Sequence, residues 1–226
     1  MDGTDRPYDY SMFTRADVVN LCHQRTQRTR DFVADPAFAQ DGPEFEALKP
    51  RIMDTVMEEI EQTFALLAPT IDLVAPGRVA DIGSGYAFFD LFLYRRYGCK
   101  LLLVDIEETE EIYFAFKAEG AGYNNLGTAR AFLEANGVPG DAIETVNPKH
   151  QDLSQAGHVD LALSLISCGF HYPVDTYDTF FREQVDTAIM LDIRGGTDGQ
   201  KTLDRYGPTR AVRSRRKYST IIARKW

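Results

Sequence analysis

The alternation of apolar runs with helix-like stretches after Pro76 and Gly77 constrains the fold of this chain most strongly. The runs are rich in β-branched residues and apolar on both faces, as strands inside a covered sheet are. Five of them are RVADI (78–82), LLLVD (101–105), AIETV (142–146), VDLALSL (159–165) and TAIMLDI (187–193). The stretches between them, 88–97, 126–136 and 174–185, read as helices. This order predicts an α/β protein with a parallel sheet covered on both sides.

The end of the chain departs from this alternation. RAVRS (210–214) and KYSTIIARK (217–225) read as two strands with no helix between them. A parallel connection needs a longer crossover, so we expect these two strands to form an antiparallel hairpin.

Residues 1–75 read as an N-terminal helical cap and residues 76–226 as the sheet domain. Thr14 is a candidate N-cap, and apolar residues recur every three or four positions between Glu44 and Leu67. The resulting stripe consists of Phe45, Leu48, Ile52, Val56, Ile60, Phe64 and Leu67. We expect it to pack on the sheet domain, or on a second copy of the chain in a homo-oligomer.

A glycine loop joins the first strand to its helix within VADIGSGYAFF (79–89). Gly83 and Gly85 allow a sharp turn and the close approach of a ligand. The second strand ends at Asp105, 20 residues after Gly85, where a carboxylate can accept the hydroxyl protons of a ribose. We therefore expect a cofactor that contains a nucleoside.

Two residues near this loop indicate which cofactor it binds. Phe88 stands where a dinucleotide-binding GxGxxG motif has its third glycine, which disfavours a pyrophosphate. Asp81 places a carboxylate beside the loop, which favours a cationic ligand. S-adenosylmethionine carries an ammonium and a sulfonium and no phosphate.

DIGSGYA and LLLVDIEE resemble the first two cofactor motifs of class I S-adenosylmethionine-dependent methyltransferases, over about residues 78–225. The resemblance implies a Rossmann-like sheet of seven strands, mostly parallel, with a C-terminal antiparallel hairpin. It implies that Asp81, Gly83 and Gly85 line the methionine end, that Asp105 binds the ribose, and that Asp152 and Leu153 meet the adenine. The further cofactor contacts that it implies are Ser84, Tyr86, Ile106, Ser164 and Leu165.

The segment after the fourth strand, SLISCGFHYPVDTY (164–177), is where such enzymes commonly place substrate chemistry. It lacks the Asn-Pro-Pro-Tyr sequence of amino-group methylases and contains His171, an imidazole suited to take a proton from a hydroxyl. The alternative is a histidine that only stabilises the loop.

GFHYPVDTY and EGAGYNNLGTARAFLEANGV (119–138) are also similar to bacterial methyltransferases that act on sugar hydroxyls. The stretch 112–125 is aromatic, with Gly120 and Gly122 as hinges, and reads either as a binding loop or as an extra surface helix. Candidate substrate contacts are Tyr123, Asn124, Tyr172 and Asp192.

Composition and charge disfavour some classes of binding partner and some cellular locations. The formal net charge of −9 disfavours nucleic acid, and we interpret the basic stretch 210–225 as a solvated hairpin face in preference to an RNA or anion site. No apolar run reaches the length of a membrane span, and three scattered cysteines favour a reducing compartment. We therefore expect a cytoplasmic protein. We expect no metal, because no carboxylate follows the fourth strand before Asp175, where a metal ligand would be needed.

The sequence therefore predicts methylation of a small-molecule hydroxyl, such as that of a sugar or a glycosylated metabolite. The alternatives are methylation of RNA or protein, and a nucleotide-binding module without catalysis. An aminopropyl transferase is disfavoured because residues 1–75 show no counterpart of its β domain.

Overall fold

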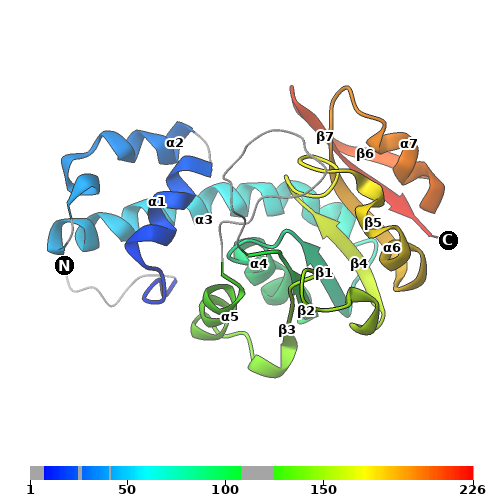
Figure 1. Ribbon diagram of the computed structural model, residues 1–226, viewed down its shortest axis with the longest axis horizontal. Coiled ribbons are helices and arrows are strands. Elements are labelled where there is room, and N and C mark those ends of the chain that lie inside the picture. The colour runs from blue at the N-terminus through cyan, green and yellow to red at the C-terminus, as the bar shows by residue number, and fades with distance from the viewer. Residues whose placement is uncertain (1–7, 25–26, 41, 108–124, 226) are drawn as a thin grey trace.

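The computed structural model describes residues 8–24, 27–40, 42–107 and 125–225. Its centre is a seven-stranded sheet with the strand order β3-β2-β1-β4-β5-β7-β6 (Figure 1). The strands are β1 (Arg78–Ile82), β2 (Lys100–Val104), β3 (Ile143–Val146), β4 (Val159–Ser164), β5 (Val185–Arg194), β6 (Thr209–Ser214) and β7 (Tyr218–Arg224). β1 to β5 pair in parallel, and β7 is antiparallel to both β5 and β6. The predicted fold class is confirmed.

The strand order determines where a ligand can bind. β1 lies between β2 and β4, so the chain leaves β1 toward one edge of the sheet and later returns to its other side. In parallel α/β sheets, ligands bind at such a reversal, outside the carboxyl ends of the strands. The glycine loop follows β1 at that edge.

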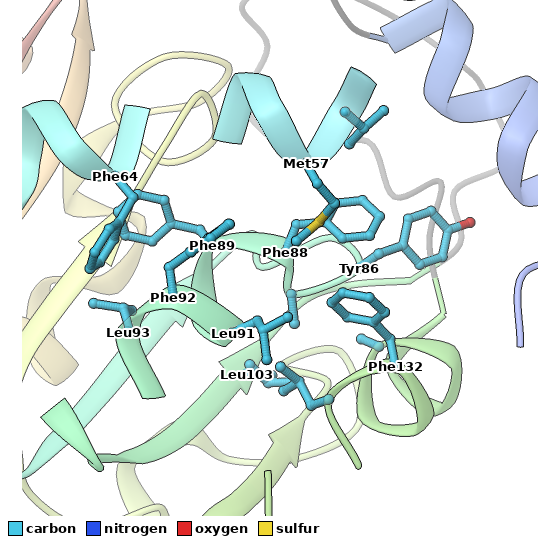
Figure 2. Packing of buried hydrophobic residues seen from close by; sticks show 14 of the residues in the cluster. Met57, Phe64, Tyr86, Phe88, Phe89, Leu91, Phe92, Leu93, Leu103 and Phe132 are labelled. Carbon is cyan, nitrogen blue, oxygen red and sulfur yellow. The ribbon is translucent and has the colours of Figure 1, made fainter. Parts of the chain in front are cut away.

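One face of the sheet is covered by α3 (Pro43–Ile71), α4 (Phe88–Tyr97) and α5 (Leu126–Ala135). Figure 2 shows Phe64 and Met57 of α3 above Phe89, Phe88 and Leu91 of α4. The other face packs on α6 (Asp178–Glu183) and α7 (Gly199–Leu203) through Phe180, Phe181 and Leu203. Both faces are buried over the central strands β1, β2, β4 and β5, as the strand composition predicts, whereas the edge strand β6 is largely exposed.

The helices agree with the sequence where the apolar periodicity is long. α4 has the predicted bounds and α5 ends one residue early. The predicted helix 174–185 is instead a 3₁₀ turn, Val174–Tyr177, followed by the short α6. The sequence did not predict α7, because five residues, GQKTL, are too few to show a periodicity.

The N-terminal region contains α1 (Arg15–Gln24), α2 (Gln27–Arg30) and two 3₁₀ turns, Asp31–Ala34 and Pro36–Ala39. Thr14 caps α1 as predicted: its Oγ1 accepts the Asp17 amide at 3.3 Å, and Asp17 Oδ2 accepts the Thr14 amide at 2.8 Å. These reciprocal bonds satisfy donors that the first turn would otherwise leave free.

The apolar stripe of α3 is covered within the chain in two ways. Its C-terminal half packs on α4, where the Phe64 ring lies 5.4 Å from Phe89 and 5.7 Å from Phe92. Its N-terminal half packs on the other N-terminal elements, with Phe45 at 6.1 Å from Phe38. The expectation that the whole stripe lies on the sheet domain is therefore half correct, and a second copy of the chain is not needed to bury it. The predicted division at residue 75 separates two regions that share one core cluster.

All three cysteines are buried and free. Among the described residues, none of the helices combines the length and the apolar character that crossing a bilayer requires.

Candidate active site

The glycine loop turns sharply between β1 and α4. Gly83 and Gly85 have φ angles of 79° and 60°, which side chains disfavour, and the Gly83 amide donates to the Val104 carbonyl at 2.7 Å. A Cβ on Gly83 would lie 2.1 Å from Ser167 Oγ, so only glycine fits there. A Cβ on Gly85 would meet no atom of the described residues within 4 Å. Glycine is therefore favoured at position 85 by its φ angle and not by crowding.

Asp105 lies against this loop, and its predicted contact with a ribose stays a prediction. Its Oδ2 accepts the Gly85 amide at 3.0 Å and its Oδ1 accepts the Ile106 amide at 2.8 Å. The side chain is 9% exposed. The structure thus brings the tip of β2 and the glycine loop together, with a fixed carboxylate between them.

The loop has its last left-handed residue at Ala87, with a φ angle of 59°, directly before α4. Position 88, where a dinucleotide-binding motif has its third glycine, lies inside the helix. Phe88 is the first residue of α4 and a core side chain, while the conformation that favours glycine occurs one residue earlier.

A second buried carboxyl, which the sequence analysis missed, accompanies Asp81. Asp90 of α4 is fully buried, and its carboxyl is hydrogen-bonded to that of Asp81. Burial raises the pKa of Asp81 well above its usual range, and Asp90 and Asp105 raise it further. Burial also raises the pKa of Asp90. The signal in the sequence is one acidic residue inside the apolar run FFDLFLY.

Tyr86 points away from the turn and into the N-terminal region. Its hydroxyl donates to Asp17 Oδ1 at 2.5 Å, and its ring meets Phe13 edge-on at 5.2 Å. Phe13 in turn packs on Phe88 and Phe132. The predicted contact of Tyr86 with the cofactor stays untested. In the structure, the Tyr86 hydroxyl bonds to α1 and so joins α1 to the glycine loop.

Asp152 and Leu153 follow β3, at the same edge. Asp152 is exposed and its Oδ1 accepts the Ser154 amide at 2.9 Å; hydrogen bonds from the Ser154 side chain and then from its amide lower the pKa of this carboxyl. Leu153 is 7% exposed and packs in the core of the second sheet face. Their predicted contact with adenine stays a prediction.

The loop after β4 is tied to the glycine loop. Ser164 is buried; its hydroxyl donates to the Ile82 carbonyl at 2.6 Å and accepts the Cys168 amide at 2.8 Å. Ser167, which the sequence analysis missed, lies against Gly83. The His171 amide donates to the Ser167 carbonyl at 2.8 Å. His171, half-buried, is thus one backbone turn from the glycine loop, and Leu165 is also half-buried.

Tyr172 is 5% exposed and its hydroxyl is 3.0 Å from Ser167 Oγ. Burial raises the pKa of Tyr172, and the nearby Tyr177, Cys168 and Asp105 contribute to the increase. Tyr172, Ser167 and Asp105 therefore gather around Gly83.

Asp192 is fully buried at the end of β5. Its Oδ1 accepts a hydrogen bond from Thr220 and lies 3.5 Å from Arg213, and its Oδ2 accepts the Ile166 amide at 3.2 Å. Burial raises the pKa of Asp192. The predicted substrate contact is untested, and these partners favour a role in holding the loop after β4.

Tyr123 and Asn124 lie outside the described residues. Within the described ranges, no three His, Cys, Asp or Glu side chains gather as metal ligands.

No protein-family model and no curated protein matches this sequence. Among solved structures, the chain is similar to cofactor-bound Rv0187 from MTB, at 16% identity and a TM-score of 0.49, over 89% of this chain and 97% of that protein. It is similar to an RNA methyltransferase from Salinibacter ruber in complex with S-adenosyl-L-homocysteine, at 14% identity and a TM-score of 0.43, over 75% of this chain and 90% of that one. A proposed O-methyltransferase from Nostoc punctiforme matches at 14% identity and a TM-score of 0.45, over 75% of this chain.

This chain spans only 59% of the Nostoc protein. Identities and TM-scores this low transfer no activity to the chain, so the fold is assigned from its own strand order. The order and the terminal hairpin are those expected of the class I methyltransferase fold.

Proposed function

We propose that this chain is an S-adenosylmethionine-dependent methyltransferase that methylates a hydroxyl of a small molecule, such as a sugar or a glycosylated metabolite. The observation that carries the proposal is the contact of Asp105 with the Gly85 amide at 3.0 Å. It joins the tip of β2 to the glycine loop at the reversal of strand order, where this fold class accepts a nucleoside.

The residues present fit this cofactor better than a dinucleotide. Asp81 is buried beside the loop against the carboxyl of Asp90, and burial raises its pKa; a cationic ammonium or sulfonium would favour its ionised form. A pyrophosphate would oppose ionisation of Asp81 and would face the carboxyl of Asp105. A buried pair of carboxyl groups beside the loop is therefore an argument for a cation at this position.

Each part of the cofactor has candidate partners. Asp105 would accept the ribose hydroxyls, and the backbone of Gly83, Ser84 and Gly85 would follow the methionine. Ile106, Leu153 and Leu165 would line the adenosine, with Asp152 at the amino group of the adenine. When bound, this cofactor supplies an electrophilic methyl group on sulfur.

The chain's own contribution to the chemistry is to orient the acceptor and to take up its proton. We assign His171 as the base, because the Ser167 carbonyl that accepts its amide belongs to the residue packed on Gly83. An imidazole with a pKa near neutrality can accept a hydroxyl proton at physiological pH. Tyr172, together with Tyr123 and Asn124, would hold the acceptor in line with the methyl group.

The proposal is tested by incubating the full chain with methyl-labelled S-adenosylmethionine and a panel of monosaccharides and glycosylated phenols. We expect labelled product and an equal amount of S-adenosylhomocysteine. If the label appears only in RNA or only in protein in a parallel panel, the methyl acceptor is RNA or protein and not a small molecule. Tight cofactor binding with no transfer to any acceptor would leave a nucleotide-binding module.

A further inference from the structure

Five cationic side chains gather at the carboxyl edge of the sheet, in a group that we name the edge cluster: Arg194, Arg213, Arg215, Arg216 and Lys217. The register of the strands places them together. Arg194 at the end of β5 pairs with Tyr218 at the start of β7, and Ser214 at the end of β6 pairs with Ser219. The β6–β7 turn therefore lies at the same edge as the glycine loop and the loop after β4.

The edge cluster is joined to His171 by a short series of ring contacts. The Phe170 ring lies 4.8 Å from the His171 ring and 5.6 Å from the Tyr218 ring. The Arg194 guanidinium lies 5.3 Å from the centre of Phe170, and that of Arg213 lies 5.4 Å from the centre of Tyr218. Positive charge thus begins one aromatic ring away from the proposed base.

The backbone holds this turn in place. The Gly195 amide donates to the Lys217 carbonyl at 2.9 Å, and the Arg215 amide donates to the Tyr218 carbonyl at 2.8 Å. The first bond ties the turn to the segment after β5, and the second closes the hairpin. The three turn cations are therefore carried by an ordered turn, although their side chains are exposed.

Most of this charge is not neutralised inside the described part of the protein. Arg213 lies 3.5 Å from Asp192, but no ion pair joins the other four cations to a carboxylate among the described residues. Asp198, on the segment after β5, is paired with Lys201 at 2.8 Å. Arg194 Nη1 is buried and has no hydrogen-bond partner in the same ranges. A buried donor without a partner costs free energy that an anionic ligand would recover.

We propose that the methyl acceptor carries an oxyanion, a phosphate or carboxylate group, which the edge cluster binds while the acceptor hydroxyl faces His171. This inference rests on the proposed methyltransferase function. Guanidinium groups match both oxyanions through paired N–H donors. A small acceptor is favoured over RNA because the cluster is confined to the ends of β5 and β6 and the turn after β6. The chain as a whole has a net charge of −9 and repels a long phosphate backbone.

The inference is tested by calorimetric titration of the full chain with glucose 6-phosphate, glucuronate and unmodified glucose. The test variant R215Q/R216Q/K217Q removes three charges from the turn. The matched control K100Q/R205Q/R210Q removes three exposed charges near the opposite edge, where β2 and β6 begin. We expect an anionic sugar to bind the parent at least about tenfold more tightly than glucose, and the test variant but not the control to lose that advantage.

The two anionic probes distinguish phosphate from carboxylate. Equal affinity of the parent for all three sugars, or an unchanged advantage in the test variant, would overturn the inference. A short single-stranded RNA that displaces the bound sugar and binds more tightly would overturn it in favour of a nucleic-acid acceptor. S-adenosylhomocysteine is titrated separately. If S-adenosylhomocysteine binds and the anionic sugars do not, the inference fails and the proposed function stands. If the anionic sugars bind and S-adenosylhomocysteine does not, the proposed function is rejected.

Discussion

The hydroxyl of Tyr86, in the glycine loop, donates a 2.5 Å hydrogen bond to Asp17 of α1. The same carboxylate closes the N-terminal cap of α1 through Thr14. The cap region and the loop that we propose binds the cofactor are thus joined through one side chain.

We expect Tyr86→Phe to lower the free energy of unfolding by about 1–2 kcal/mol, because it removes a part-buried hydrogen bond to a charged group and leaves the ring in place. Urea unfolding followed by circular dichroism measures this change. Tyr97→Phe is the matched control, since its hydroxyl bonds to Asp72 at an exposed site and should matter less. Equal unfolding midpoints for the parent and Tyr86→Phe would show that the bond does not hold the cap.

The buried carboxyls of Asp81 and Asp90 make stability depend on pH. Burial raises the pKa of Asp90 to about 7, above the value of about 4 expected in the unfolded chain. Between these values the folded chain keeps a proton that the unfolded chain has lost, so raising the pH favours unfolding. We expect the parent to lose stability from pH 5 to pH 8, and Asp90→Asn to reduce that loss.

Urea midpoints at pH 5 and pH 8 measure this difference. The control is Asp72→Asn: hydrogen bonds from Arg96 and Tyr97 lower the pKa of Asp72, so this carboxyl is ionised at both pH values. That variant should be less stable than the parent by the same amount at pH 5 and pH 8. A parent whose stability is constant over this range would show that the buried pair does not titrate as described.

His171→Ala should lower turnover of a hydroxyl acceptor by roughly 10²–10⁴-fold, because the variant has no base to take the proton. The affinity for S-adenosylhomocysteine should be unchanged. His158→Ala is the matched control, since His158 is exposed just before β4, at the opposite edge. If both variants turn over like the parent from pH 6 to pH 9, His171 stabilises the loop and is not the base.

The sheet and its edge could be predicted because they depend on local patterns. Strands such as RVADI are apolar on both faces, and the β1 bounds match the prediction to the residue. Gly83 and Asp105 could be placed together because two neighbouring parallel strands end at the same edge. The spacing along the chain therefore carried three-dimensional information.

What the sequence did not predict depends on contacts between distant segments. The Asp81–Asp90 pair follows from the packing of α4 on β1, and no spacing rule links the two. Ser167 is one serine in a loop, and its place against Gly83 comes from the fold of the turn after β4. The basic stretch 210–225 read as a solvated face, and only the register of β6 and β7 shows that the β6–β7 turn lies at the same edge as the loop after β4.

The central claim is the identity of the cofactor, and calorimetric titration of the full chain with S-adenosylhomocysteine and with NAD tests it most directly. We predict that S-adenosylhomocysteine binds one-to-one and that NAD does not bind. Asp105→Asn should weaken binding by about 10- to 100-fold, while Asp141→Asn, an exposed change before β3, should leave it unaltered. Binding of NAD without binding of S-adenosylhomocysteine would contradict the account.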